Sequence, residues 1–240
     1  MKKTQQLSLK GKTALVTGGN RGIGLAIARA MVDAGAQVII TGRDAAKLRA
    51  AGKKLSTRGA AFTVDVRDPQ QVKTLFRDVK KRFGHLDFLI NNAGIAHANL
   101  TVEKMPFDVW QSVMSTNLDG LFLVTHYALP LMSAGGVIVN NLSRAAVNPF
   151  QGMSAYNTSK SGALAFTNSL RMEVRKQGIR VTALIPGAIE TDIWEQFWAD
   201  APRDKMLSPT EVAKVVLHVL TLPDQATIEQ LQIGPTSGDL

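Results

Sequence analysis

A tyrosine, a lysine and a serine in the second half of the 240-residue chain could together move a proton to a substrate oxygen. Tyr156 and Lys160 lie four residues apart in a segment predicted to be helical, so their side chains share one helix face. Ser143 directly follows an apolar run that is typical of a buried strand. A nearby ammonium stabilises tyrosinate and lowers the tyrosine pKa from its ordinary value of about 10, and a hydroxyl can polarise a carbonyl oxygen. These residues suit a carbonyl that accepts a hydride and then needs a proton, although Tyr-x3-Lys alone occurs often by chance.

A glycine-rich segment in the first half has the features of a phosphate-binding turn. The apolar run Thr13–Thr17 is followed by Gly18, Gly22 and Gly24, and an apolar-periodic stretch then begins at Ile23. Glycines let the backbone turn tightly and approach a phosphate, and the helix N-terminus offers N–H groups and a positive dipole end. The spacing G-x3-G-x-G differs from the commoner G-x-G-x-x-G, but the flanking strand and helix indicate a dinucleotide site.

The end of the next apolar run favours NADP(H) over NAD. An NAD site places Asp or Glu there to hold the ribose 2′-hydroxyl, whereas this chain has Arg43, and Arg21 lies in the glycine turn. Two guanidinium groups can bind a 2′-phosphate through charge-assisted hydrogen bonds. The alternative is that Arg43 is an ordinary exposed arginine. We interpret Asp44 as the N-cap of the next helix rather than as a ribose ligand.

Short apolar runs alternate with helical patterns along the chain, and these elements must position the residues above. The expected strands cover residues 13–17, 37–41, 61–66, 86–91, 137–142, 180–185 and 227–233. The expected helices cover residues 23–34, 44–55, 69–83, 107–132, 154–177 and 209–222. The alternation predicts an α/β fold with a doubly wound, Rossmann-like parallel sheet of about seven strands and helices on both faces. Because no repeat or linker interrupts the pattern, we expect residues 1–240 to form a single domain.

The composition excludes several classes of site. A hydrophobic content of 45% with 20% charged residues is typical of a globular protein. The chain has no cysteine, which rules out disulfides and thiolate chemistry, and its four histidines are scattered, so no metal site is expected. No apolar run approaches the length of a membrane span, and polar residues follow the basic N-terminus where a signal peptide is apolar. We therefore predict a cytoplasmic protein without a membrane partner.

The positive charge is concentrated in one part of the chain. Residues 1–82 hold 18 Lys/Arg and 5 Asp/Glu, a net +13, whereas residues 83–240 hold 10 and 14, a net −4, which together give +9. Basic residues can attract nucleic acid or an anionic cofactor. The aromatic residues of a nucleic-acid groove do not interleave with these charges, so solvated faces of two helices are favoured and no nucleic-acid partner is expected.

The motifs taken together resemble the short-chain dehydrogenase/reductase family in its single-domain, NADP-preferring form. The resemblance runs from Lys12 to about Ile233 and rests on the order of its motifs. They are Thr17-Gly18 with Gly22-Ile23-Gly24, Asp65-Val66, Asn91-Asn92-Ala93-Gly94, Asn117, Ser143, Tyr156-x3-Lys160, and Pro186-Gly187 with Thr191.

The resemblance implies a role for each matching position. Tyr156 is the expected general acid/base, Lys160 binds the nicotinamide ribose and lowers the pKa of Tyr156, and Ser143 holds the substrate oxygen. Asn117 is expected to anchor a water that passes protons to Lys160. The expected NADP(H) contacts are Gly18, Arg21, Gly22, Ile23 and Gly24 at the pyrophosphate, Arg43 at the 2′-phosphate, Asp65 and Val66 at the adenine, Asn92 and Gly94 beside its ribose, and Tyr156, Lys160, Pro186, Gly187, Ile189 and Thr191 at the nicotinamide end.

The substrate region is less defined. In this family the segment 190–208 forms a lid, and its aromatic residues either create an apolar pocket or pack the lid onto the core; they are Trp194, Phe197 and Trp198. Four residues between Ser143 and Tyr156 are expected to line the same cavity: Arg144, Asn148, Phe150 and Met153. Arg144 either pairs with an acidic substrate or points to solvent.

The chain also departs from the family pattern. Its last strand ends in Ile233-Gly234-Pro235 rather than a Gly-Gly pair, and the connection at Ser133–Gly136 lacks basic residues, which counts against a carrier-protein thioester. We therefore predict an NADP(H)-dependent oxidoreductase that acts on a small-molecule carbonyl or alcohol. The resemblance also implies a homotetramer or homodimer that pairs the helices near 107–132 and 154–177. The alternative is a non-catalytic NADP(H)-binding sensor or scaffold, which the presence of all four catalytic residue types disfavours.

Overall fold

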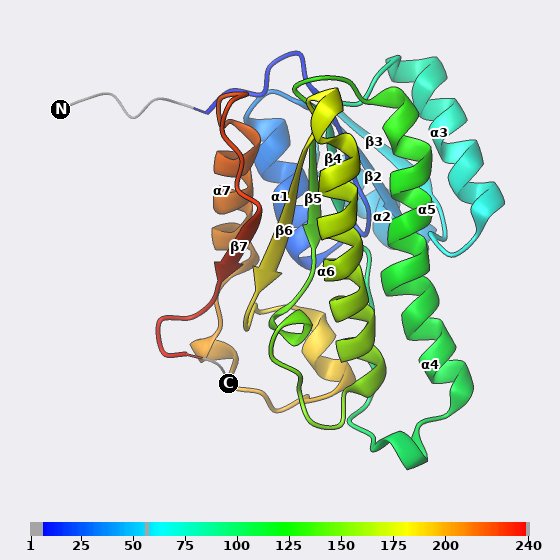
Figure 1. The fold of residues 1–240 in the computed structure, drawn as a ribbon, viewed down its shortest axis with the longest axis vertical. Helices are drawn as coiled ribbons and strands as arrows, with labels where there is room; N and C mark the ends of the chain where they lie inside the picture. The colour runs from blue at the N-terminus through cyan, green and yellow to red at the C-terminus, as the bar shows by residue number, and fades with distance from the viewer. Residues whose placement is uncertain (1–6, 56–57, 239–240) are drawn as a thin grey trace.

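A seven-stranded parallel sheet forms the centre of the molecule (Figure 1). The computed structural model describes residues 7–55 and 58–238; the N-terminal segment considered as a signal and the last two residues lie outside this described part. The strand order is β3-β2-β1-β4-β5-β6-β7. The strands are β1 (Thr13–Val16), β2 (Gln37–Gly42), β3 (Gly59–Thr63), β4 (Phe88–Asn91), β5 (Val137–Asn141), β6 (Arg180–Pro186) and β7 (Gln230–Ile233). All six neighbouring pairs among them are parallel, which confirms the predicted α/β fold.

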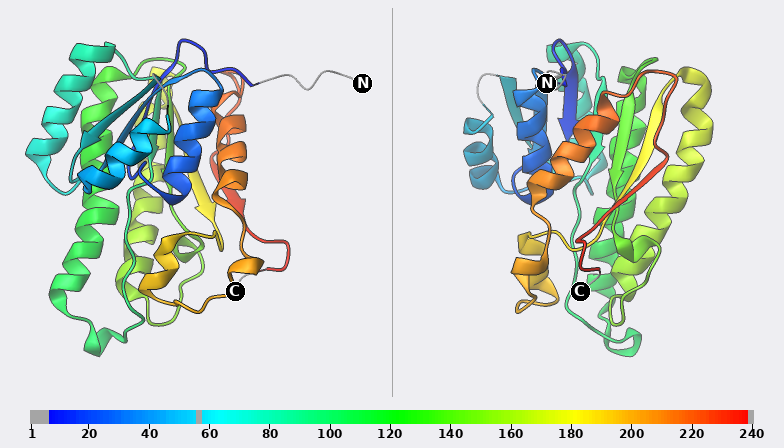
Figure 2. Two further views of the ribbon diagram at one scale, coloured as in Figure 1. Left: turned by 180° about the vertical axis from the view of Figure 1, so that it is seen from behind. Right: turned by 90° about the vertical axis from the view of Figure 1, so that its left-hand side faces the viewer.

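Helices cover both faces of the sheet and make three layers (Figure 2). One face carries α1 (Gly22–Asp33), α2 (Ala45–Lys53) and α7 (Pro209–Leu220), and the other carries α3 (Pro69–Phe83), α5 (Gly120–Ala128) and α6 (Ser154–Val174). The strands alternate between the two hydrophobic cores, since Ala14 and Val16 pack in the first and Leu15 packs in the second. Strands buried on both faces read as the continuous apolar runs seen in the sequence.

Several elements differ from their predicted bounds: the fourth and seventh strands begin later than expected, at Phe88 and Gln230 rather than at residues 86 and 227. The third strand begins at Gly59 and ends at Thr63, so Val64–Val66 leave the sheet. This strand lies at the edge and takes its register from β2, whose Val38 and Gly42 pair with Gly59 and Thr63. Partner geometry therefore overrides the apolar pattern that favoured residues 61–66.

The helix expected over 107–132 is interrupted. It consists of α4 (Phe107–Met114), a π-helical turn at Ser115–Asp119, and α5, followed by a 3-10 turn at Leu129–Leu131. A Cβ on Gly120 would lie 2.7 Å from Val66 Cγ2, so glycine permits the close approach of this helix to the segment after β3. The π-turn carries Asn117, and such turns often occur at functional sites.

Two helix starts follow the predicted capping. The Asp44 carboxylate accepts hydrogen bonds from the backbone N–H groups of Ala46 and Lys47 at the start of α2. The Asp68 carboxylate does the same for α3. Asp44 is thus engaged by its own helix, as the sequence interpretation expected.

Buried amides hold α6 against the sheet. Asn140 on β5 donates to Thr167 Oγ1 on α6 at 2.9 Å and accepts from Asn91 on β4 at 2.9 Å. Asn91 also donates to Thr125 Oγ1 on α5 at 2.9 Å. Hydrogen bonds in a buried environment are costly to break, so this network fixes the two helices relative to the strand ends.

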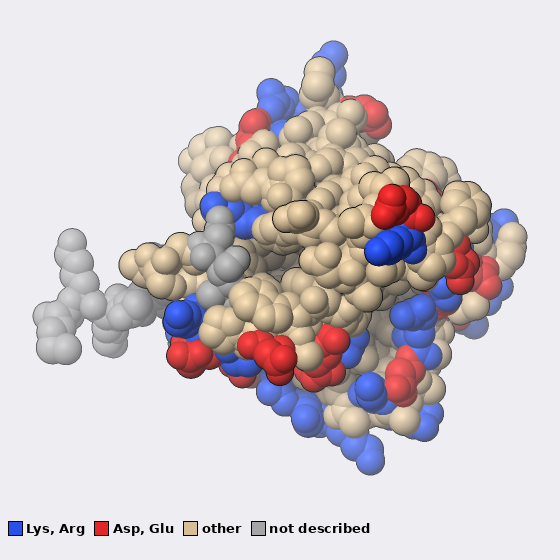
Figure 3. All heavy atoms as spheres, turned by 90° about the horizontal axis from the view of Figure 1, so that it is seen from below, with Lys and Arg blue, Asp and Glu red and all other residues tan. Residues whose placement is uncertain are grey.

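Charged residues lie mainly at the margins of the face formed by the carboxyl ends of the strands, whose centre is uncharged (Figure 3). The basic residues singled out on α2, α3 and the turn after α2 are exposed, as solvated faces should be. Within residues 7–55 and 58–238, no helix is long and apolar enough to cross a membrane. The same described residues contain no group of three or more His, Asp or Glu arranged to hold a metal ion.

Candidate active site

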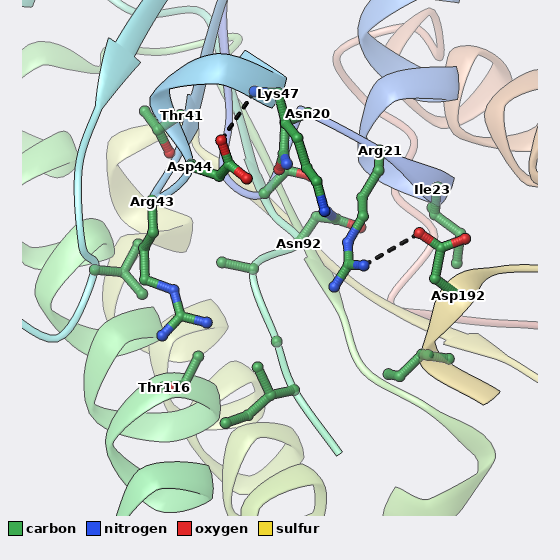
Figure 4. Close-up of a pocket in the computed structure, with 18 of the residues that line it drawn as sticks. Asn20, Arg21, Ile23, Thr41, Arg43, Asp44, Lys47, Asn92, Thr116 and Asp192 are labelled. Carbon is green, nitrogen blue, oxygen red and sulfur yellow. Dashed lines mark hydrogen bonds and ion pairs between the residues drawn. The ribbon is translucent and has the colours of Figure 1, made fainter. Parts of the chain in front are cut away.

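A groove of about 350 Å³ lies at the carboxyl ends of β1, β2 and β4 (Figure 4). The strand order reverses between β1 and β4, and open α/β sheets bind ligands at such a reversal. Ten of the predicted cofactor residues line the groove: Gly18, Arg21, Gly22, Ile23, Arg43, Asp65, Val66, Asn92, Gly94 and Thr191. The structure thus brings together segments that are far apart in the sequence.

The glycine turn is shaped for close backbone approach. Gly18 and Gly22 have φ angles of +63° and +52°, which disfavour side chains. Gly24 lies beneath the turn rather than in the groove lining, and a Cβ there would lie 2.5 Å from the Gly18 carbonyl oxygen. Asn92 Nδ2 donates to the carbonyls of Thr17 and Gly18 at 2.9 and 3.2 Å, so β4 holds the turn in place. The turn opens directly into α1, which leaves its first N–H groups facing a ligand.

The positive groups of the groove separate into two places (Figure 4). Arg43 follows β2, and Lys47 and Asn20 also line this part of the groove. Arg21 instead turns toward the segment after β6, where its Nη1 lies 3.1 Å from Asp192 Oδ2. Arg21 and Arg43 therefore do not form the pair expected from sequence. The sequence did not indicate that Lys47 lines the groove, although it lies in the first turn of the helix that follows Arg43.

Asp65 and Val66 form the wall expected beside an adenine. The Asp65 carboxylate binds Arg67, with Nη2 of the arginine 2.6 Å from Oδ2. This hydrogen bond is the main reason that the pKa of Asp65 lies below its ordinary value; burial acts in the opposite direction. The carboxylate is consequently held in its charged form with a defined orientation.

A second cavity of about 120 Å³ adjoins the groove and contains Ser143 and Tyr156. Ser143 Oγ accepts a hydrogen bond from the Ala145 N–H at 3.1 Å, which orients the side chain at the start of a 3-10 turn. The Tyr156 phenol lies in the same cavity as Ser143. Burial is the larger influence on the pKa of Tyr156 and raises it, while the interaction with the Ser143 hydroxyl lowers it. The depression of this pKa by Lys160 stays a prediction.

Lys160 lies one turn along α6 from Tyr156, as its spacing predicts. Its Nζ lies 5.7 Å from the Tyr156 ring centroid and donates to the Asn141 carbonyl at 3.1 Å. The side chain is buried, and this burial lowers the pKa of Lys160 from 10.5 to about 8. A small fraction of the Lys160 side chains is therefore deprotonated near neutral pH.

Asn117 is tied to its surroundings by both ends of its amide. Its Oδ1 accepts from the Ile95 N–H at 2.9 Å, and its Nδ2 donates to the Ile95 carbonyl and to Ser159 Oγ. A Cβ on Gly94 would lie 3.4 Å from Asn117 Oδ1 and 3.6 Å from Lys160 Nζ. Asn117 and Lys160 thus approach the same side of the Gly94 backbone.

His97 contacts the helix that carries Tyr156. The Tyr156 backbone N–H donates to His97 Nε2 at 3.4 Å, and His97 Nδ1 lies 2.6 Å from the Ala98 carbonyl oxygen. Because a carbonyl only accepts, Nδ1 carries the proton and Nε2 is the acceptor. A neutral His97 therefore caps one free N–H of α6, whose N-cap residue Met153 makes no side-chain cap.

The segment after β6 closes the second cavity. The predicted nicotinamide-facing residues Pro186, Gly187 and Ile189 line this cavity, and Thr191 lines both. Trp194 and Phe197 also line it, with ring centroids 4.9 Å apart. Trp198 is 43% exposed and does not line it.

The four residues expected between Ser143 and Tyr156 divide into two pairs. Arg144 and Phe150 line the cavity. Asn148 is exposed, and Met153 is buried in a small apolar cluster with Tyr156, so neither forms part of the lining as we expected.

Comparison with known proteins shows the family of this chain. Residues 12–202 match the short chain dehydrogenase family, and the chain belongs to that family. It is 34% identical to sulfoacetaldehyde reductase 2 of Chromohalobacter salexigens over 235 residues, with 92% of this chain and 93% of that protein covered. It is 33% identical to the 3-oxoacyl-acyl-carrier-protein reductase of Vibrio cholerae over 232 residues, covering 92% and 94%.

Solved structures give the same result. A dehydrogenase/reductase from Sinorhizobium meliloti superposes with a TM-score of 0.87 at 30% identity, covering 95% of each chain. The 3-ketoacyl-acyl-carrier-protein reductase from Brucella melitensis, complexed with NADH, superposes with a TM-score of 0.86 at 28% identity, covering 94% of this chain and 98% of that one. The chain is thus an oxidoreductase of the carbonyl/alcohol class with a nucleotide-binding fold.

Replacing Lys160 by methionine should stabilise the protein at neutral pH. The folded-state pKa of Lys160 is lowered, so its burial penalty is fully present below pH 8 and disappears as the pH rises from about 8 toward 10.5. Removing the ammonium should raise the free energy of unfolding at pH 7 by about 1–3 kcal/mol, allowing for the lost hydrogen bond. Urea unfolding from pH 7 to 10 measures the difference in the free energy of unfolding between Lys160→Met and the wild type. This difference should become smaller as the pH rises. Lys214→Met, at an exposed site, is the control; a difference that is absent or grows with pH contradicts the burial argument.

Replacing His97 by phenylalanine should impair turnover through Tyr156. Loss of a cap should reduce the free energy of unfolding by about 1–2 kcal/mol and loosen the N-terminus of α6. We expect kcat to fall about 10-fold or more while KM changes little, because a misplaced acid/base weakens the chemical step. His97→Gln retains an acceptor oxygen and should recover most of the loss. Equal kcat values for the phenylalanine and glutamine variants would show that the cap is unimportant.

Proposed function

We propose that the protein is an NADP(H)-dependent oxidoreductase that interconverts a carbonyl compound and its alcohol, with Tyr156 as the general acid/base. The observation that carries the proposal is that Ser143 and Tyr156 line one cavity, which adjoins the nucleotide groove. The two cavities share Ile23, Thr191 and Ile193, so a substrate beside Tyr156 would adjoin the groove.

The groove fits a dinucleotide phosphate. Gly18 and Gly22 have positive φ angles that let the turn approach a ligand closely, and the open N-terminus of α1 suits a pyrophosphate. Arg43 and Lys47 supply positive charge after β2, and the carboxylate of Asp44 is engaged as a helix cap. This donor set supports a 2′-phosphate rather than a free 2′-hydroxyl. When bound, the nicotinamide supplies or accepts the hydride.

The chain's own residues handle the oxygen and the proton. The Ser143 hydroxyl donates to the carbonyl oxygen, while its own acceptor capacity is used by the Ala145 N–H. The Tyr156 phenol gives its proton to that oxygen as the alcohol forms, and takes it back in the reverse direction. The buried Lys160 stabilises the phenolate, and Asn117 fixes the backbone of Ile95 beside this relay.

We also propose that the chain works as one domain whose segment 190–208 is a lid, and that it assembles as a homo-oligomer. The Trp194 ring N–H donates to the Ile189 carbonyl at 2.8 Å, and Arg203 donates to the Thr191 carbonyl at 2.7 Å. These bonds tie the segment together over the cavity. Exposed Phe122 on α5 and Met172 on α6 support contact between copies through those helices.

Replacing Tyr156 by phenylalanine should abolish turnover and spare nucleotide binding. General acid–base catalysis contributes about 10²–10⁴-fold, so kcat/KM for carbonyl reduction should fall by at least about 100-fold. The Kd for NADPH, measured by fluorescence, should stay within about two-fold. The only other tyrosine gives a matched control, Tyr127→Phe, which should remain active. Retained turnover in Tyr156→Phe refutes the acid/base role, and tight NADPH binding without wild-type turnover on a carbonyl panel supports a sensor.

Replacing Arg43 by alanine should collapse a preference for NADPH over NADH. A charge-assisted hydrogen bond is worth about 1.5–3 kcal/mol, so NADPH binding should weaken by about 10- to 100-fold while NADH binding changes little. Fluorescence titration of both nucleotides measures this, and Lys47→Ala should act in the same direction. Arg77→Ala, on the exposed face of α3, controls for net charge. If the wild type binds NADH as tightly as NADPH, the protein is NAD-dependent and the interpretation of Arg43 is wrong.

A further inference from the structure

A single permanent charge lines the cavity beside Tyr156. Fifteen residues of the described chain line it, and apart from the Tyr156 phenol the only ionisable side chain among them is Arg144. Aspartate, glutamate, lysine and histidine are all absent from this lining. Most of the remainder is apolar, including Phe150, Trp194 and Phe197. A guanidinium in such surroundings attracts an anion more strongly than one in water, because the local dielectric is lower.

The backbone of Arg144 is fixed beside Ser143. Ser143 and Arg144 are consecutive, and the hydrogen bond from Ala145 to Ser143 Oγ holds them at the start of the 3-10 turn Arg144–Ala146. The turn packs against α6, because Ser161 Oγ donates to the Ala146 carbonyl at 3.1 Å. The residue that would hold the substrate oxygen and the arginine therefore form one rigid unit.

The volume of the cavity limits what can lie between these groups. It measures about 120 Å³, whereas an engineered apolar cavity of about 150 Å³ accommodates benzene. Residues expected to face the nicotinamide line the same cavity, so a substrate beside the bound nucleotide would have at most roughly five to seven heavy atoms. In so small a substrate, the anionic group would be bonded either to the carbonyl carbon itself or to the carbon next to it.

We propose that Arg144 selects small anionic carbonyl compounds, those that carry a carboxylate or sulfonate one or two carbons from the reacting C=O. This inference rests on the proposed function and specifies its substrate class. The planar guanidinium matches two oxygens of either anion, and its five N–H donors allow it to serve a protein acceptor and a substrate together. The apolar walls would exclude water from this contact and disfavour larger or cationic compounds.

The test compares anionic substrates with neutral compounds of the same shape. Pyruvate and 2,3-butanedione differ by a methyl group in place of one carboxylate oxygen, as do acetoacetate and 2,4-pentanedione, and 2-sulfoacetaldehyde tests the sulfonate. Initial rates with NADPH are measured for the wild type, Arg144→Gln and Arg144→Lys. Arg77→Gln removes the same charge on exposed α3 and is the matched control. Calorimetric titration of pyruvate into each protein with NADP⁺ present reports binding independently of turnover, because the oxidised nucleotide cannot reduce the carbonyl.

We expect the wild type to prefer at least one anion over its neutral partner by about 10-fold or more in kcat/KM. Arg144→Gln should lose this preference mainly through KM, Arg144→Lys should keep part of it because the charge remains, and Arg77→Gln should keep all of it. The preferred anion in the panel distinguishes a carboxylate from a sulfonate substrate.

Two results overturn the inference. Equal kcat/KM for every matched pair in the wild type shows that charge is not recognised, and equal losses for both members of a pair in Arg144→Gln show a structural role. If pyruvate binds in an Arg144-dependent way without turnover of any compound, the anion site stands and the proposed reductase function fails. If there is neither binding nor turnover of any anion while neutral carbonyls are reduced, the anion site fails and the reductase function stands.

Discussion

The burial of the Lys160 ammonium beside the Tyr156 phenol is the constraint on which the rest of the site depends. Taking an ammonium out of water is unfavourable, and here the pKa of Lys160 falls to about 8 as a result. Hydrogen bonds from the neighbouring elements hold this arrangement in place. Asn140 and Thr167 join α6 to β5, and Lys160 itself donates to the Asn141 carbonyl. The burial of this charge lowers the stability of the fold at the candidate active site, and such a loss of stability is common at functional sites.

The carboxyl ends of the strands form a site with two compartments beside this buried charge. The nucleotide groove lies where the strand order reverses, and the smaller cavity lies beside it at the ends of β5 and β6. Positive charge is found in both, with Arg43 and Lys47 in the groove and Arg144 in the cavity. An anionic group of a ligand would meet Arg43 and Lys47 in the groove, and Arg144 among mostly apolar residues in the cavity. Ser143 caps the turn that carries residue 144, so the side chain at position 144 can change without loss of that turn. A change there would alter the substrate preference on the same fold.

Much of this arrangement was predictable because it depends on local periodicity and on turn chemistry. The strands are apolar runs buried on both faces, and Asp44 and Asp68 cap helices at the residues where a cap was expected. What could not be predicted depends on contacts between distant segments. The π-turn around Asn117 accommodates packing of Gly120 on Val66, Arg21 turns to Asp192 across 171 residues, and His97 caps a helix 59 residues away. No periodic pattern encodes such pairs. Lys47 is the exception, since its place in the first turn of the helix after Arg43 was visible in the sequence.

The most direct measurement of the central claim is the pKa of Tyr156 itself. The chain has two tyrosines, so Tyr127→Phe leaves Tyr156 as the one tyrosine whose Cζ carbon can be followed by ¹³C NMR as the pH is raised. The titration is run on this protein and on the same protein with Lys160→Met, each without nucleotide and with saturating NADP⁺. Burial predicts a pKa above the ordinary value in the free protein. The proposed role of Lys160 predicts that, with NADP⁺ bound, the Tyr156 pKa is lower in the protein that retains Lys160 than in Lys160→Met. A Tyr156 pKa that is the same with and without Lys160 when NADP⁺ is bound would contradict the assignment of this pair as the proton-transfer centre.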